Sequence, residues 1–369
     1  MSSTEIKVKN KELKYSIFLG SNILNLLPKK IKLICPKAEK IGLVVDKQIP
    51  KKQKNNIKKL LKNYKVLTFE YSTNEKLKSF KHVNNLVEKC LLNNFKRSDV
   101  LISFGGGITG DFTAFVASII KRGVNFINIP STLLAQVDSS IGGKTGVNSM
   151  YGKNLIGSFY QPCLVISDLS LLNSLPKREI ICGYAEILKH AVINDVGFFS
   201  WLKKNSTKIL EDRNLDVLKY AIFKSCKIKS NIVEKDVKEK DIRMILNFGH
   251  TFAHAIEVKN NYSRRINHGE AVLMGMMIAT KLSFLKKTCT LNTLRELEDI
   301  YSENNLNYKF DKYFSFKDHD KIIRFMSNDK KNNSDKINLI LLKKIGKTTK
   351  PGQHKFSTSQ LRRVFNKII

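Results

Sequence analysis

The sequence has no long hydrophobic run and no secretory leader. Its longest apolar stretch, AVLMGMMIA from Ala271, is much shorter than the roughly 20 residues that a membrane-spanning helix needs. The opening residues, MSSTEIKVKN, contain no apolar segment typical of a signal peptide. We therefore expect a protein without a membrane span, a membrane partner or a secretory signal.

Paired cysteines are also absent. The six cysteines stand apart, with no C-x-x-C pair, at Cys35, Cys90, Cys163, Cys182, Cys226 and Cys289. This spacing is typical of reduced, mostly buried thiols and argues against a disulfide framework or a cysteine-ligated zinc. It favours a cytoplasmic protein.

Arginine is scarce among the many basic residues. Lys and Arg number 65 against 32 Asp and Glu, a net charge of +33, yet only 11 of the 65 are Arg. Such a surplus permits nucleic-acid binding. Proteins that clamp phosphates or bases, however, usually concentrate Arg and interleave aromatics. Lysines spread among many Asn instead favour a solvated surface, a few of whose lysines serve an anionic substrate, and we expect no specific nucleic-acid partner.

The first half of the chain alternates short apolar runs with helical stretches. One helix is predicted over 75–95, and an opening hairpin over 5–9 and 14–20. Buried strands are predicted over 41–46, 65–71, 99–104 and 125–132. Strand–helix–strand repetition of this kind is typical of a mostly parallel α/β sheet.

After about residue 175 the apolar pattern changes to the helical period. It covers residues 179–193, 215–236, 245–258 and 269–287. Only 336–342 has the pattern of a late strand, and SNDKKNNSDK at 327–336 predicts a surface loop. At 369 residues the chain is long enough for two domains, which we place at 1–175 and 176–369.

A glycine-rich turn follows one of the predicted strands. In SFGGGITGD, a G-x-G-x-x-G spacing begins at Gly105, between a strand and a helix, which is the setting of a dinucleotide fingerprint. The acidic residue expected about 20 positions later is missing, because no carboxylate lies between Asp111 and Asp138. Asp46, at the end of another strand, is an alternative ribose partner. A modified nucleotide site and an ordinary glycine turn both remain open.

Two further glycine-rich segments carry lysines. DSSIGGKTGVN at 138–148 contains Lys144, and YGKNLIG at 151–157 contains Lys153. Loop lysines beside flexible backbone suit phosphate or carboxylate binding. For an isolated Gly-Lys pair, an ordinary surface loop is the simpler interpretation.

Histidines and a carboxylate gather in the second half. NFGHTFAHAIE places His250 and His254 on one helical face, with Thr251 where an H-E-x-x-H zinc helix has its Glu. Glu186 lies in an apolar helical segment, where an unpaired carboxylate is costly, and His268 precedes a helix start. A set of two His and one Glu leaves a catalytic zinc an open position. The spacing does not choose between His250 and His254, and a core histidine remains an alternative for either.

Seven ordered blocks resemble the 3-dehydroquinate synthase family, of the shikimate pathway, over nearly the whole chain. They are GGGITGDFTAFVAS, KRGV, IPSTLLAQVDSSIGGKTGVN, GKNLIGSFYQP, GYAEILKHAVI, LNFGHTFAHAIE and HGEAVLMGM. The resemblance implies an NAD-binding α/β domain over 1–175 and a mainly helical metal- and substrate-binding domain over 176–369. It also implies NAD and zinc or cobalt as cofactors, and a homodimer.

The resemblance further implies the site residues. The metal ligands match Glu186, His250 and His268, which leaves His254 facing the substrate. The NAD contacts match Asp46, Glu75, Lys78, Gly106, Gly107, Ile108, Asp111, Ser131, Thr132, Lys144, Lys153, Leu171 and Ser174. The substrate contacts match Asp138, Lys144, Asn154, Lys189, Lys229, Arg243, Asn247, His254, a late lysine (Lys330 or Lys331), and Arg122 reaching into the partner's site.

The chain departs from the family pattern at four of these positions or their neighbours. Asn74 stands where Gly is usual, and Ser131 stands where Thr is common and keeps the hydroxyl. Leu171 and Ser174 replace the usual aromatic residue and Thr. No charged contact is lost at Asn74 or Ser131, so the implied activity stands.

The implied activity converts 3-deoxy-D-arabino-heptulosonate 7-phosphate to 3-dehydroquinate and phosphate. NAD oxidises C5 while the metal acidifies its hydroxyl; the C6 proton then becomes acidic and phosphate leaves. Reduction, ring opening and an aldol closure follow. Lysines and arginines hold the doubly anionic substrate, and His254 transfers a proton or orients a water. The alternatives are another sugar-phosphate cyclase, a metal-dependent polyol dehydrogenase of related fold, and a nucleic-acid-binding protein.

If the lysine surplus is a solvated surface, DNA and RNA will bind only weakly and without sequence preference at physiological salt. We expect dissociation constants of about 1 μM or weaker, because such binding depends on phosphate neutralisation alone. Fluorescence anisotropy with labelled DNA and RNA of several sequences measures this. Sequence-selective binding near nanomolar at the same salt would contradict the prediction.

Overall fold

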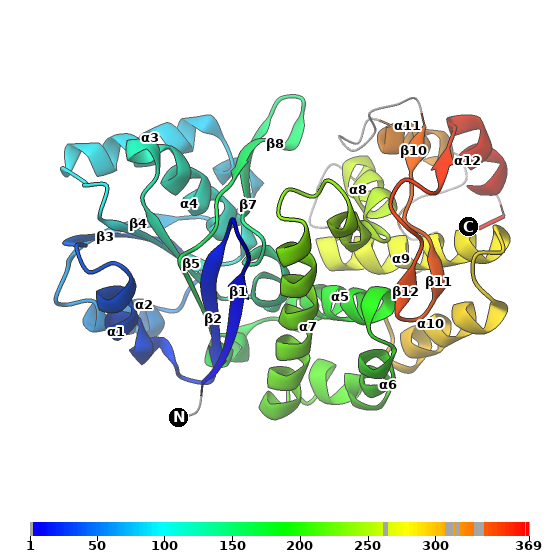
Figure 1. Ribbon diagram of the computed structural model, residues 1–369, viewed down its shortest axis with the longest axis horizontal. Coiled ribbons are helices and arrows are strands. Elements are labelled where there is room, and N and C mark those ends of the chain that lie inside the picture. Colours follow the sequence, from blue (N-terminus) through cyan, green and yellow to red (C-terminus); the bar gives the residue numbers. More distant parts are fainter. Residues whose placement is uncertain are drawn as a thin grey trace. The chain divides into compact units, whose positions relative to one another are not determined.

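The computed structural model describes residues 3–260, 265–306, 313, 318–327, 336–365 and 367–368. It divides the chain into two units, Met1–Pro176 and Lys177–Ile369 (Figure 1). Two predictions fall outside the described residues. They are the late lysine of the substrate site, Lys330 or Lys331, and most of the surface loop over 327–336.

The first unit is built on a seven-stranded sheet with the order β1-β2-β9-β6-β5-β3-β4. Strands β1 and β2 form an antiparallel hairpin, and the other neighbouring pairs in this sheet are parallel. The predicted opening hairpin and mostly parallel α/β sheet are therefore confirmed. The strands are β1 Thr4–Lys9, β2 Lys14–Gly20, β3 Lys40–Asp46, β4 Lys65–Tyr71, β5 Val100–Gly105, β6 Asn125–Pro130 and β9 Leu164–Asp168.

Alternate residues of the central strands enter two apolar cores. In β3, Leu43 and Val45 pack with helices α1 and α2 on one face, whereas Val44 packs with α3 and α4 on the other. Burial on both faces explains why these strands have continuous apolar runs. The helices are α1 Leu27–Ile34, α2 Lys51–Leu60, α3 Phe80–Leu92 and α4 Gly107–Ile119.

The helix predicted over 75–95 is shorter than expected. Its first residues form a separate 3-10 turn, η2 Glu75–Leu77, in which the Asn74 side chain accepts a hydrogen bond from the Lys76 backbone. Lys78 then leaves the helical region, with ψ of 66°, and α3 begins after Ser79, whose backbone is extended. The interruption lies in the backbone conformation of Lys78 and Ser79, which the apolar spacing does not reveal.

The two glycine-rich segments predicted as loops form an antiparallel hairpin, β7 Lys144–Ser149 and β8 Gly152–Phe159. Gly146 pairs with Gly157 across it. A Cβ built on Gly157 would lie 2.0 Å from the Thr145 carbonyl oxygen. The glycines therefore permit two strand backbones to approach closely, rather than marking a loop.

The second unit is mainly helical, as predicted. The late strand expected over 336–342 is split: β10 Ile337–Asn338 pairs with β13 Lys355–Phe356, and β11 Leu342–Lys344 pairs with β12 Lys347–Thr348. None of the helices described here has the length and apolar character needed to cross a membrane. The helices are α5 Lys177–Asn194, α6 Val196–Leu210, α7 Leu215–Lys235, α8 His250–Lys259, α9 His268–Leu285, α10 Leu291–Glu303, α11 His319–Ser327 and α12 Thr358–Phe365.

Glycines bring the backbones of α5, α8 and α9 into contact. Gly249, at φ +77°, precedes α8 and lies against α9: a Cβ on Gly275 would lie 2.2 Å from the Gly249 carbonyl oxygen. Gly269, in the first turn of α9, lies against α5, where a Cβ would come within 2.3 Å of the Cys182 Cα. A side chain at Gly275 or Gly269 requires the helices to move apart.

Gly275→Ala is expected to lower the free energy of unfolding by about 2 kcal/mol, since overpacking between two backbones has no flexible side chain to relieve it. Gly197→Ala, in the first turn of α6, is the matched control. Its Cβ would lie 3.4 Å from Asp195 Oδ1, an ordinary contact, so the higher helix propensity of Ala leaves stability equal or slightly increased. Urea denaturation followed by circular dichroism compares the two; wild-type stability in Gly275→Ala would show the contact to be unimportant.

Candidate metal centre and nucleotide site

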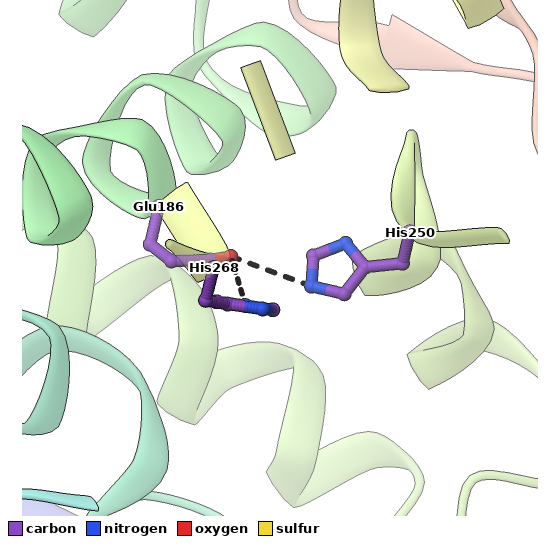
Figure 2. Close-up of side chains that lie close together, drawn as sticks. All are labelled: Glu186, His250 and His268. Atoms are coloured by element: carbon purple, nitrogen blue, oxygen red, sulfur yellow. Dashed lines mark ion pairs between the residues drawn. The ribbon is translucent and has the colours of Figure 1, made fainter. Parts of the chain in front are cut away.

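Glu186, His250 and His268 lie together in the second unit, as Figure 2 shows. Their ligand atoms are all within 4.8 Å of one another. The Nε2 atoms of His250 and His268 lie 3.3 Å and 3.6 Å from Glu186 Oε1. Each of the three residues lies close to one of the glycine contacts between helices. His250 follows Gly249, and His268 precedes Gly269. Glu186 lies one turn after Cys182, the α5 residue that Gly269 contacts.

The Glu186 carboxylate is fully buried, and a lysine one turn away compensates its charge. Lys189, one turn later on α5, pairs with Oε2. Within the described part of the chain, neither carboxylate oxygen accepts a hydrogen bond of ordinary geometry. Burial would raise the pKa of Glu186, but the Lys189 ammonium, together with the imidazole rings beside the carboxylate, outweighs burial and holds the pKa well below its usual range. An ionised carboxylate beside two imidazole nitrogens is a donor set that fits a divalent metal such as zinc.

The two imidazoles differ in charge. Burial and the Lys189 ammonium lower the pKa of His250 to about 4, so His250 is neutral at pH 7 and able to coordinate a cation. Burial acts in the same direction on His268, but the carboxylates of Glu257 and Glu186 outweigh it and raise the pKa to about 10. The proton on His268 therefore balances the carboxylates, and a metal bound to this ring would displace it.

His254 lies one turn after His250 on the same face of α8, as its spacing predicts. The two rings have centroids 5.5 Å apart, and the His250 and His268 rings are equally close. Among the described residues, however, His254 does not join the group of ligand atoms. The geometry therefore brings His250, and not His254, to Glu186.

Three cationic side chains predicted to contact the substrate are buried in the second unit. Lys189 is 1% exposed, Lys229 of α7 is 6% exposed and Arg243 is 2% exposed. Arg243 and Asn247 come from the turn η6 Ile242–Asn247, where Arg243 Nη1 donates to Val237 O at 2.5 Å and Asn247 Nδ2 donates to Glu239 Oε1 at 2.7 Å. Bulk surface charge does not explain this buried positive charge, because Lys and Arg are almost never fully buried unless they are paired.

In the first unit, several predicted cofactor and substrate residues make direct contacts. Lys78 Nζ lies 2.6 Å from Asp111 Oδ2 and 2.5 Å from Asn154 Oδ1. Lys153 Nζ lies 2.8 Å from Glu75 Oε1. These side chains come from three separate segments, which are η2 with the residue after it, the start of α4, and strand β8. Segments far apart in sequence therefore meet here.

Other predicted nucleotide residues lie at the carboxyl ends of adjacent parallel strands. Asp46 ends β3, Gly106 and Gly107 follow β5, and Ser131 and Thr132 follow β6. Since β4 and β5 lie on opposite sides of β3, the strand order reverses between β3 and β5. Nucleotides bind at this position in open α/β sheets, and α4 begins here with its free backbone N–H groups.

The remaining predicted residues have other surroundings. Leu171 packs into the core of α1 and α2, on the opposite sheet face from Ile108 and α4, so the structure does not join it to the Lys78–Asp111 pair. Ser174 is exposed. Asp138 lies in a π-helical turn, Ala135–Ser139. Lys144 and Arg122 are exposed, and Arg122 has a positive φ of 60°.

Two residues that the sequence did not predict contribute to these sites. Asn148 joins the hairpin to η2, because its Nδ2 donates to Glu75 Oε2 at 2.8 Å and its Oδ1 accepts from the Asn154 backbone at 3.0 Å. Glu257 Oε1 lies 3.5 Å from His268 Nδ1. Glu257 shares a helical face with His250, a signal that sequence spacing could have supplied. Asn148 has no such signal, since its contacts depend on the hairpin.

Two family profiles match the chain. The profile "3-dehydroquinate synthase N-terminal" matches residues 68–182, and "3-dehydroquinate synthase C-terminal" matches residues 183–332. The 3-dehydroquinate synthase of Pelagibacter ubique is 49% identical over 346 residues, which are 94% of this chain and 94% of that protein.

Two solved structures share the fold. A 2-deoxy-scyllo-inosose synthase, complexed with carbaglucose-6-phosphate, NAD+ and Co2+, has a TM-score of 0.87 and 23% identity over 99% of this chain and 100% of its own. A 2-epi-5-epi-valiolone synthase from Streptomyces hygroscopicus, with NAD+ and Zn2+ bound, has a TM-score of 0.84 and 20% identity over 98% of both chains. At these identities the likeness concerns the fold alone.

His250→Ala is expected to lose bound metal, because it removes one of the two nitrogen donors beside Glu186. His254→Ala should keep the metal and lose turnover. Elemental analysis of both purified variants, after dialysis against a weak chelator, separates the two roles, and circular dichroism verifies that each is folded. Equal retention or equal loss of metal would show that the pair is assigned wrongly.

Proposed function

This chain belongs to the 3-dehydroquinate synthase family, and we propose that it is a phosphate-eliminating lyase that makes 3-dehydroquinate. In the proposed route, 3-deoxy-D-arabino-heptulosonate 7-phosphate is oxidised at C5, loses phosphate, is reduced, opens its ring and closes by an aldol step. The 49% identity to a 3-dehydroquinate synthase, over 94% of both chains, carries the proposal.

We assign the metal to Glu186, His250 and His268. When bound, zinc or cobalt supplies a Lewis acid for the hydroxyl that is oxidised, and NAD supplies the hydride acceptor. The ionised, buried Glu186 and the neutral His250 support this assignment. Three protein ligands leave room for substrate oxygens.

The substrate's carboxylate and phosphate are assigned to the buried cations Lys189, Lys229 and Arg243. Charge interactions are stronger away from bulk water, so a few buried cations orient a doubly anionic molecule more firmly than the many surface lysines. Their burial supports this role. The further substrate contacts that we propose are Asp138, Lys144, Asn154, Asn247 and Arg122.

His254 is the residue that we assign to proton transfer. It lies one helical turn from His250, with the two ring centroids 5.5 Å apart, so it would be near a substrate bound at the metal without occupying a ligand position. An imidazole nitrogen can accept and release a proton, which suits abstraction of the C6 proton or orientation of a water that performs it.

NAD is assigned to the carboxyl edge of the sheet in the first unit. There Asp46 would contact the ribose, and the backbone of Gly106 and Gly107 would hold the pyrophosphate at the start of α4. The position of the strand-order reversal supports this assignment. The remaining contacts that we propose are Glu75, Lys78, Ile108, Asp111, Ser131, Thr132, Lys144, Lys153, Leu171 and Ser174.

We further propose a cytoplasmic homodimer in which Arg122 completes the partner's site. All six cysteines are among the described residues and none forms a disulfide, which supports a reducing compartment. Arg122 is exposed and lies in a turn with a positive φ of 60°, so its side chain is accessible to a partner.

Another sugar-phosphate cyclase is the second candidate, because two such enzymes share the fold. A substrate panel distinguishes the two, since both activities need NAD and a metal. The chain's identity to those cyclases is 23% and 20%, against 49% to a 3-dehydroquinate synthase, which favours the first proposal.

The proposed reaction is redox-neutral, so one equivalent of phosphate should appear per substrate consumed while NADH absorbance stays flat. Removing NAD should stop phosphate release, because the C6 proton is not acidic without the C5 ketone. Coupled phosphate detection and absorbance at 340 nm measure both quantities. A polyol dehydrogenase gives the opposite result, with NADH accumulating in step with the substrate and no phosphate released.

A further inference from the structure

Glu257 is a largely buried carboxylate to which the proposed chemistry gives no role. It lies on α8, three residues after His254 and seven after His250, so these three side chains share one helical face. Its side chain is 14% exposed, and its Oε1 lies 3.5 Å from Nδ1 of His268. A carboxylate from α8 thus contacts the first residue of α9.

The two candidate ligand histidines are oriented in the same way. In each ring Nε2 faces Glu186 Oε1, while Nδ1 faces a different oxygen. That oxygen is the Phe248 carbonyl, at 3.3 Å, for His250 and Glu257 Oε1 for His268. A ring nitrogen that donates a proton to oxygen cannot bind a metal, so this arrangement leaves Nε2 of both rings for the cation.

His268 depends on its partner more than His250 does. Both histidines are the first residue of their helix, but the His250 side chain is 11% exposed and follows the Gly249–α9 contact, whereas the His268 side chain is 29% exposed. Packing therefore restricts the His268 ring less. A carboxylate at Nδ1 both fixes the ring and increases the donor strength of Nε2, which a neutral carbonyl does less effectively.

We propose that Glu257 is a positioning residue that accepts a hydrogen bond from His268 Nδ1, holds Nε2 toward Glu186 and thereby sets the affinity of the metal centre. The inference rests on the proposed function, which assigns the metal to Glu186, His250 and His268. A carboxylate that serves only as an ion pair between α8 and α9 would affect stability and leave the metal's surroundings unchanged.

The test compares metal affinity and the visible spectrum of bound Co2+ in the full-length protein. Zinc affinity is measured by competition with a chromophoric chelator, and the Co2+ d–d bands report ligand geometry. For Glu257→Ala we expect zinc affinity about 10- to 100-fold weaker and altered Co2+ bands. Glu257→Gln should fall between Glu257→Ala and wild type, because its amide oxygen still accepts from Nδ1 but carries no charge.

Asp195→Ala is the matched control. Asp195 also contacts a cation, Lys224, at 2.8 Å, and its side chain caps α6, so its loss lowers stability in the same unit. The zinc affinity and Co2+ bands of the Asp195→Ala variant should equal those of wild type. If Glu257→Ala does not fold, Glu257→Asp is tested in its place. The aspartate keeps the charge, but its side chain is one methylene shorter, so its oxygens lie farther from His268 and weaker zinc binding is again expected.

Wild-type affinity and Co2+ bands in Glu257→Ala, or in Glu257→Asp when that variant is used, would overturn the positioning role and leave the proposed function intact. An equal loss in Asp195→Ala would also overturn it, because general destabilisation would then explain the effect. A wild-type protein that binds neither zinc nor Co2+ would overturn the proposed function itself.

Discussion

The candidate metal centre depends on backbone contacts between helices. Imidazole and carboxylate side chains are short, so three of them converge within 4.8 Å only if their helices approach closely. The helices α5, α8 and α9 can approach because glycine has no side chain to separate them. Gly275 lies against Gly249, and Gly269 lies against Cys182. The positions of Glu186, His250 and His268 follow from these two contacts, and the same packing encloses the centre in apolar helices.

That enclosure has an electrostatic consequence. A buried carboxylate such as Glu186 is unfavourable unless cations lie close to it, and the chain supplies Lys189 from the same helix and a protonated His268. Lys229 and Arg243 add buried positive charge in the same unit. The second unit therefore contains several buried charges. Replacing them with apolar residues would increase stability, and keeping such charges at a cost in stability is typical of sites that bind ions.

Much of the architecture could be predicted because apolar periodicity reports burial. The continuous apolar runs of the central strands and the helical period after residue 175 identified the parallel sheet and the helical unit. Spacing could not choose between His250 and His254, since both lie on one face of α8. The family resemblance selects His250, whose Nε2 lies 3.3 Å from Glu186 Oε1 in the structure. The hairpin of β7 and β8 was interpreted as loops because glycine favours turns in isolation, whereas Gly146 and Gly157 face each other across two strands. The contacts of Asn148 depend on that pairing, and so no local pattern predicted them.

Helix α8 carries His250, His254 and Glu257 along one face. Because an α-helix rises about 1.5 Å per residue, the axial separation between the first two is about 6 Å, whatever packs around the helix. The distance between the proposed metal ligand and the proposed proton carrier is thus a property of covalent geometry and backbone hydrogen bonding. A small translation of α8 along α9 shifts both groups by the same amount, so cation binding and proton transfer respond together to any change in how these two helices pack.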